Sequence, residues 1–136
     1  MDKAFQEKYF QLQQIGANMK QFEQQLQQVD QQVQELSVIR DSLIEIPMTK
    51  HDTEILIPLG NGIFAKGSVR DRDDVIVSVG GNIAVKKNFK DASDLIDRQI
   101  KELKDIESEL AAEMQNMSLA AKSLEDELNE LSKSQR

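Results

Sequence analysis

Residues 53–88 read TEILIPLGNGIFAKGSVRDRDDVIVSVGGNIAVKKN, and this stretch decides the fold. β-Branched residues are concentrated here, as is typical of strands. The runs are interrupted by Gly60-Asn61-Gly62 and by Gly80-Gly81-Asn82, residue types that adopt the positive φ angles of tight turns. The stretch therefore predicts two short β-hairpins in succession, and we expect no strand elsewhere in the chain.

Heptad repeats flank the hairpins on both sides. Apolar residues recur at alternating steps of three and four over 5–43 and again over 96–131. A narrow apolar seam of this kind favours pairing with one partner helix. We expect an N-terminal helix over 1–46 and a C-terminal helix over 91–133, folded back on each other. The predicted fold is α+β: a long antiparallel two-helix coiled coil with two inserted β-hairpins, forming one domain over 1–136.

Local signals set the expected ends of the helices. Pro47 should end the first helix, because proline supplies no N–H and pushes the preceding residue out of the α region. Asp91, Ser93 and Asp94 offer capping oxygens and negative charge for the start of the second helix.

Three charged residues interrupt the seams: Lys8 and Arg40 in the first, and Glu107 in the second. The antiparallel register predicts that Arg40 lies level with Asp97, so we expect these two side chains to pair. For Glu107 the register offers no cation. For all three charged residues, the favoured interpretation is that the side chain reaches water or only sets the register of the two helices.

Alternation within the hairpins defines their faces. Leu56 and Phe64 lie behind the apolar face of the first hairpin. Pro58 belongs at an edge or a bulge, and Gly67 is expected at another bulge. We predict that the shared apolar faces consist of Ile55, Ile57, Leu59 and Ile63 in the first hairpin and of Val75, Val77, Val79, Ile83 and Val85 in the second.

These apolar faces have no predicted sheet or helix of the same chain to cover them. A lone hairpin is marginal in water, and apolar edge strands need a partner. We therefore expect the hairpins to contribute to a β-barrel shared between subunits, because closure removes the edges. The helical arms should project from that assembly.

Composition excludes several classes of function. The chain has 136 residues, a net charge of −7, 30% charged and 4% aromatic residues, and no cysteine. An acidic chain without a basic stripe is not expected to bind nucleic acid, and no apolar run is long enough for a membrane span or a secretory signal. We expect a cytoplasmic protein without disulfides.

Motifs for catalysis are missing from the sequence. His51 is the single histidine, with no second histidine or cysteine to complete a metal site or a catalytic triad. Asp71, Asp73 and Asp74 lack the spacing of a calcium loop, and the glycine turns lack the lysine of a phosphate loop. We expect no enzyme activity, no metal and no cofactor.

The remaining candidates for binding lie at the ends of the two helices, where a coiled coil frays. Closing the end of the coiled coil is the alternative role, and for Leu124 and Leu128 it is the favoured one. For the N-terminal aromatic residues the two roles are balanced. The candidate binding residues are Phe5, Tyr9, Phe10, Leu12, Leu124, Leu128 and Leu131.

The segments ILIPLGNGIFAKGSV and DDVIVSVGGNIAVKKN resemble the paired hairpins of α-type subunits of archaeal prefoldin. The resemblance covers the whole chain, and the turns at Asn61 and at residues 80–83 depart from it modestly. It implies a hexamer of two α-type and four β-type subunits that holds non-native polypeptides at its tips. It also implies their transfer to a group II chaperonin without ATP. The alternative function is a coiled-coil scaffold or adaptor with one dedicated partner.

Overall fold

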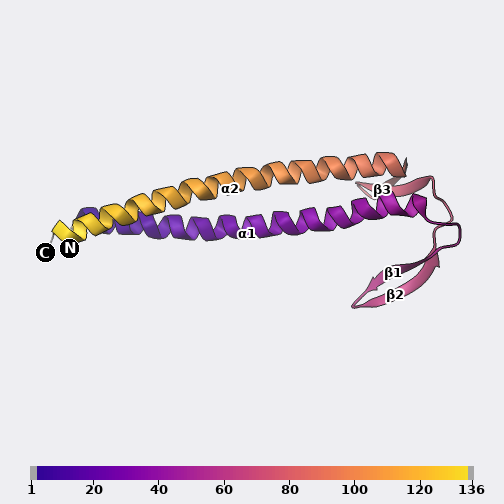
Figure 1. Ribbon diagram of the computed structural model, residues 1–136, viewed down its shortest axis with the longest axis horizontal. Helices are drawn as coiled ribbons and strands as arrows, with labels where there is room; N and C mark the ends of the chain where they lie inside the picture. The colour runs from indigo at the N-terminus through magenta and orange to yellow at the C-terminus, as the bar shows by residue number, and fades with distance from the viewer. Residues whose placement is uncertain (1–2, 135–136) are drawn as a thin grey trace. The chain divides into compact units, whose positions relative to one another are not determined.

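A computed structural model describes residues 3–134 of the chain. Residues 1–2 and 135–136, which the predicted domain includes, lie outside the described residues. Two long helices enclose two successive β-hairpins in the chain (Figure 1). The elements are α1 (Lys3–Glu45), the 3₁₀ turn η1 (Ile46–Met48), β1 (Glu54–Gly60), β2 (Ile63–Ser68), β3 (Asp74–Gly80), β4 (Ile83–Asn88) and α2 (Phe89–Ser134). The predicted fold class is confirmed.

Pro47 ends α1 as predicted. The α-helix stops at Glu45, and Pro47 lies inside the short 3₁₀ turn that follows, where its missing N–H costs no helical bond. Thr49 closes this turn, because its backbone N–H and its hydroxyl both donate to the carbonyl of Ile46, at 3.1 and 2.7 Å. The chain then leaves the helix and enters β1.

The start of α2 differs from the prediction. The helix begins at Phe89, and the N–H of Asp91 donates to Oδ1 of Asn88 at 2.7 Å. Asn88 is therefore the capping residue, and the predicted caps at Asp91, Ser93 and Asp94 are wrong. Because Asn88 also ends β4, strand and helix follow each other without a loop, and the capping oxygen comes from the last residue of the strand. Asp91 still places negative charge in the first turn.

Each hairpin is an antiparallel two-stranded sheet closed by a two-residue turn. The turn residues Asn61 and Gly62 have φ of 50° and 77°, and Gly81 and Asn82 have φ of 58° and 61°. Two successive positive φ angles are the signature of a type I′ turn, which matches the twist of the strands. The predicted turns are confirmed.

Register shifts next to both turns place irregularities at Leu59 and Val79. Pro58 pairs with Phe64 next to the shifted residue, in an edge strand of a two-stranded sheet, in agreement with its predicted place at an edge or a bulge. The bulge predicted at Gly67 is wrong, because Gly67 pairs with Ile55 in regular register. A Cβ atom at Gly67 would lie 2.9 Å from Cδ1 of Ile57, so the glycine makes room for that side chain.

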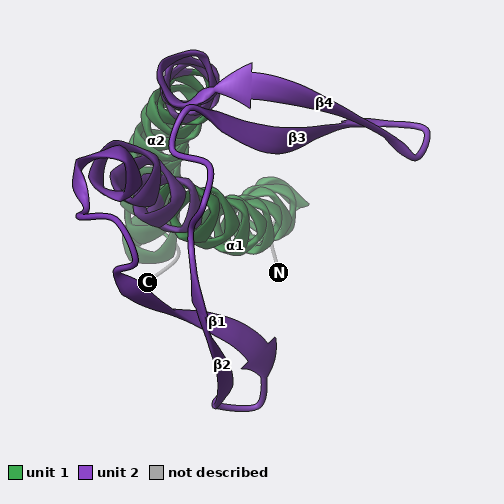
Figure 2. Ribbon diagram, turned by 90° about the vertical axis from the view of Figure 1, so that its right-hand side faces the viewer, with its two compact units in different colours: residues 1–33, 102–136 green, residues 34–101 purple. Residues whose placement is uncertain are grey.

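The chain divides into two compact units (Figure 2). Unit 1 comprises residues 1–33 and 102–136, and unit 2 comprises residues 34–101. Within unit 1 the buried apolar residues are Val33 and Leu128, and within unit 2 they are Phe89, Ala92 and Ile100. The small core of each unit thus contains residues of the helical seams. The core of unit 2 also contains residues at the junction between β4 and α2.

Candidate functional site

The end of unit 1 carries exposed aromatic side chains. We define the tip as residues 3–12 of α1 together with residues 124–134 of α2. Tyr9 is 50% exposed and Phe10 is 59% exposed, whereas Phe5 is half-buried. The rings of Phe5 and Tyr9 stack, with centroids 6.4 Å apart and an interplanar angle of 5°. Phe5 therefore supports the exposed ring of Tyr9 one helical turn away, and together they present a rigid apolar surface.

The other predicted tip residues lie closer to the seam. Leu12, Leu124 and Leu131 are half-buried, and Leu128 is only 8% exposed. Leu128 is thus the least accessible of the predicted binding residues, because it packs in the core of unit 1. The apolar surface available at the tip is supplied mainly by the aromatic residues of α1.

Salt bridges occur at two of the three charged breaks in the seams. In unit 1, Nζ of Lys8 pairs with Oε2 of Glu127. In unit 2, Arg40 lies 3.6 Å from the carboxylate of Asp97, as predicted from the antiparallel register. Both pairs join α1 to α2 and are largely exposed, so they fix register more than they stabilise the fold. The pairing of Lys8 was not predicted, although the same register would have placed it near residue 127.

Glu107 has no ion pair within the described part of the chain. It is half-buried in unit 1 and lines a shallow hollow with Glu23 and Asp30.

The hairpins of unit 2 expose most of their apolar side chains. Leu59, Val79 and Ile83 from the predicted faces are mostly exposed, and Ile57 and Val85 are exposed to a smaller extent. The reverse faces are also apolar. The strongly exposed residues there are Leu56, Phe64 and Ile76. Sequence reasoning gave Ile76 no role, although its position between Val75 and Val77 in an unbroken apolar run was a signal for a strand buried on both faces.

One part of the second hairpin does have cover from its own chain. Val75 and Val77 are half-buried, which corrects the expectation that no helix of the chain would shield them. The stretch Val75–Ser78 lines an apolar hollow of about 350 Å³ in unit 2. Its other walls are Ile39 and Leu43 of α1 and Ala92, Leu95 and Ile96 of α2. Four consecutive residues of β3 line this hollow, so side chains from both faces of the strand contribute to it.

The last turns of α1 and the 3₁₀ turn η1 that follows are apolar on several sides. Val38, Ile39, Ile44 and Met48 are all exposed to solvent within unit 2. A helix that is apolar all round is normally buried by neighbours. The heptad pattern does not predict these exposed residues, because they lie off the seam positions. The signal for them in the sequence is that apolar residues here fall between the steps of three and four.

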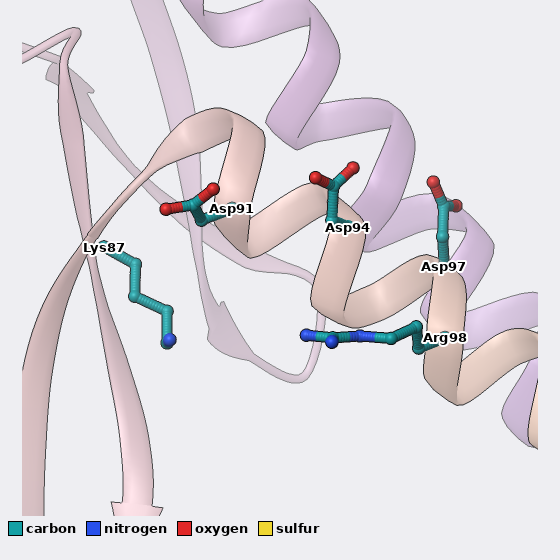
Figure 3. Close-up of a pocket in the computed structure, with 5 residues that line it drawn as sticks. All are labelled: Lys87, Asp91, Asp94, Asp97 and Arg98. Atoms are coloured by element: carbon teal, nitrogen blue, oxygen red, sulfur yellow. The ribbon is translucent and has the colours of Figure 1, made fainter.

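A second, polar hollow of about 520 Å³ lies where β4 meets α2 in unit 2. Figure 3 shows its lining: Lys87 of β4 and Asp91, Asp94, Asp97 and Arg98 of α2. The carboxylates of Asp94 and Asp97 point to one side of α2, the carboxylate of Asp91 points toward the strands, and the side chain of Arg98 extends toward Lys87 (Figure 3). Charges of both signs within one open hollow select neither an anion nor a cation.

The acidic loop between the hairpins is a structured turn. Oδ1 of Asp71 accepts hydrogen bonds from the backbone N–H groups of Asp73 and Asp74, at 2.9 and 3.2 Å. These two bonds, with a smaller effect of Lys86, lower the pKa of Asp71 below its ordinary value. Asp71 therefore organises the turn that leads into β3, as a local side-chain cap.

No group of three or more His, Asp or Glu side chains among residues 3–134 is placed to hold a metal ion. His51 lies in an exposed turn. Within the described residues, neither helix is long and apolar enough to cross a membrane. The arrangement exposes apolar surfaces at the tip and on the hairpins.

Comparison with known proteins agrees with this arrangement. The family model described as Prefoldin subunit matches residues 10–134. The chain is 36% identical over 96 residues to prefoldin subunit alpha of Methanobrevibacter smithii, a stretch that covers 71% of this chain and 65% of that protein. It is 26% identical over 130 residues to prefoldin subunit alpha of Methanococcus aeolicus, covering 96% of this chain and 88% of the other.

A solved structure has the same fold. The cryo-EM structure of filamentous PFD from Methanocaldococcus jannaschii superposes with a TM-score of 0.74 at 20% identity, covering 88% of this chain and 98% of that one.

The fold and its exposed surfaces define a class of coiled-coil proteins that carry paired β-hairpins between their helices. Within this class, the chain belongs to the prefoldin family, and it is similar to archaeal alpha subunits. Prefoldins are chaperone subunits that form oligomeric assemblies. The resemblance seen in residues 53–88 is thereby confirmed.

Proposed function

We propose that this chain is a subunit of an ATP-independent holdase that captures non-native polypeptides at its tips. The observation that carries the proposal is the exposure of Tyr9 and Phe10 at the tip together with uncovered apolar residues on both hairpins. Two separate apolar surfaces on one small acidic chain need two kinds of partner. The hairpins bind other subunits, and the tips bind clients.

Assembly through the hairpins follows from their surface. The first hairpin is apolar on both faces, and each hairpin is only two strands wide. Such ribbons are marginal alone and gain stability by joining into a larger sheet or barrel. The partners in this proposal are prefoldin β-type subunits, in a hexamer of two α-type and four β-type chains in the cytoplasm, which transfers its clients to a group II chaperonin.

Avidity is the physical basis of capture. One tip offers little apolar area, and at about 25 cal/mol per Å² it holds a client weakly. Several tips in one assembly make each later contact intramolecular, which raises the overall affinity without new contacts. Weak individual contacts also permit release without nucleotide hydrolysis.

Deletion of residues 1–10 and 124–136 tests the proposal. The shortened chain keeps both hairpins, so it should still assemble, but it should no longer suppress aggregation of chemically denatured clients followed by light scattering. Undiminished suppression by an assembled deletion variant would remove the tips from the mechanism. At least two unrelated clients are needed, because a chaperone should protect both of them.

A structural scaffold is the second candidate. It is favoured by the fold similarity to a filamentous prefoldin from M. jannaschii, since the same architecture occurs there in an extended assembly. A scaffold would dock one dedicated partner and would protect no unrelated client. The aggregation assay therefore separates the two functions.

A further inference from the structure

A third hollow, of about 400 Å³, lies at the tip of unit 1. Its lining consists of Lys8 of α1 and of Ser123, Asp126, Glu127, Glu130 and Leu131 of α2. Lys8 pairs with Glu127, so it does not neutralise the other two carboxylates. Asp126 and Glu130 are exposed, and among residues 3–134 neither forms an ion pair, although lysines lie four residues before Asp126 and three after Glu130. We call this surface the acidic hollow.

The two carboxylates lie where the helix itself disfavours negative charge. Asp126 and Glu130 are four residues apart, so they share one face of α2 and repel each other. Glu130 also lies one turn from the end of α2 at Ser134, where the helix dipole adds negative potential. A bound cation would relieve both effects. Leu131 in the same hollow offers apolar contact for the methylene groups of a lysine or an arginine.

The acidic hollow and the exposed aromatic rings lie within reach of one short segment of polypeptide. Lys8 lines the hollow, and Tyr9 and Phe10 follow it directly in α1. The two surfaces are therefore separated by no more than the thickness of one helix, about 10–12 Å. An extended chain covers that distance with about four residues. One client segment can thus contact the carboxylates and the aromatic rings together.

We propose that the tip selects client segments in which a lysine or an arginine lies within about four residues of an apolar side chain. The cation meets the carboxylates of Asp126 and Glu130, and its methylene groups lie on Leu131. The apolar side chain packs on Tyr9 or Phe10. Charge complementarity, added to apolar contact, then decides which non-native chains are held. This inference rests on the proposed function, because it names the class of client that the proposed tip holds.

Binding of short peptides to the full-length chain, assembled with a β-type subunit, tests this selectivity. Three fluorescent peptides, each too short to reach two tips, carry the same leucines and differ only at alternate positions, which hold lysine, glutamine or glutamate. Fluorescence anisotropy gives their dissociation constants. We expect the lysine peptide to bind about twofold to thirtyfold more tightly than the glutamine peptide, the effect of two exposed ion pairs. The preference should decrease as the salt concentration rises.

Two double variants and a matched control assign the preference to the acidic hollow. Asp126→Asn with Glu130→Gln removes both charges with little change in shape, so it should lose the preference for lysine and bind the glutamine peptide as before. Asp126→Lys with Glu130→Lys should prefer the glutamate peptide instead. The control is Asp105→Asn with Glu109→Gln, because these exposed residues of α2 have the same spacing and lie in unit 1 outside the tip. It should keep the preference of the unchanged chain.

Equal binding of the three peptides by the unchanged chain, or no binding of any, would overturn the inference. A preference that survives in the Asp126 and Glu130 variants, or that is lost equally in the control, would overturn it as well. None of these results removes the proposed holdase function, because capture by apolar contact alone would still suppress aggregation of denatured clients. Failure of the proposed function would appear instead as an assembled chain that suppresses the aggregation of no client.

Discussion

Replacing the exposed tip aromatics should weaken client capture without harming the fold. The change is the double variant Tyr9→Ser and Phe10→Ser. An aromatic side chain buries about 150–250 Å² when fully covered. Since Tyr9 and Phe10 are 50% and 59% exposed, a client can cover about 75–150 Å² of each. At about 25 cal/mol per Å² this contributes about 2–4 kcal/mol per side chain.

Ordering each side chain on binding costs about 0.5–1.5 kcal/mol, so the net loss is about 0.5–3 kcal/mol per residue. That corresponds to client binding weakened roughly twofold to 150-fold for each residue replaced. The assay is light scattering of a denatured client at increasing concentrations of the assembled protein. Half-maximal protection should require at least about five times more of the double variant.

Leu119→Ser is the matched control for this measurement. Leu119 is also on the surface of unit 1 and 63% exposed, but it lies outside the tip. Its replacement removes the exposed apolar surface of one side chain outside the tip and should leave protection unchanged. Equal losses in the control and in the tip variant would refute the reasoning, because general surface hydrophobicity would then explain capture. An unchanged tip variant would refute it as well.

Three further predictions concern stability. Ile100→Ala should lower the free energy of unfolding by about 2–5 kcal/mol in chemical denaturation, because Ile100 is 4% exposed; a loss below about 0.5 kcal/mol would contradict its place in the core. A double-mutant cycle on Arg40 and Asp97 should give about 1 kcal/mol or less, decreasing with salt, because the pair is largely exposed; a larger, salt-independent coupling would disagree. The pKa of Asp71, measured by NMR titration, should lie below its ordinary value of 3.8, because the N–H groups of Asp73 and Asp74 donate to it. Its stabilising effect should therefore be present above that value and be lost as the pH falls through the depressed pKa, and an Asp71→Ala variant should lack this dependence.

The sequence predicted the architecture because its local signals agree with one another. Glycine and asparagine at 60–62 and 80–82 favour positive φ, and the heptad stretches on both sides have similar lengths. The antiparallel register that follows placed Arg40 beside Asp97. Where pattern, turn chemistry and register all favour the same fold, sequence reasoning succeeds.

The errors arose where two signals competed for one position. Asn88 continues the strand pattern of β4, and this pattern hides its second role as the cap of α2. Glycine weakens strands and so predicts a bulge at Gly67, but its role is to accommodate Ile57. A side chain's need for space is a tertiary contact, and no local pattern encodes it.

Of the two candidate binding surfaces, the sequence predicts the tip but not the hollow beside β3. Tyr9 and Phe10 could be singled out because they lie off the seam of a polar helix. The hollow beside β3 could not be predicted, because its walls come from three elements that are distant in the sequence. Its existence depends on the packing of those elements, which the periodicity of each one does not specify.

The mass of the full-length chain in solution tests the central claim most directly. Sedimentation equilibrium should be measured for the chain alone and after mixing with a prefoldin β-type subunit. Uncovered hairpins should bring several chains together, so the account predicts an oligomer that grows in mass on mixing. A chain that remains a monomer with folded hairpins under both conditions would contradict it.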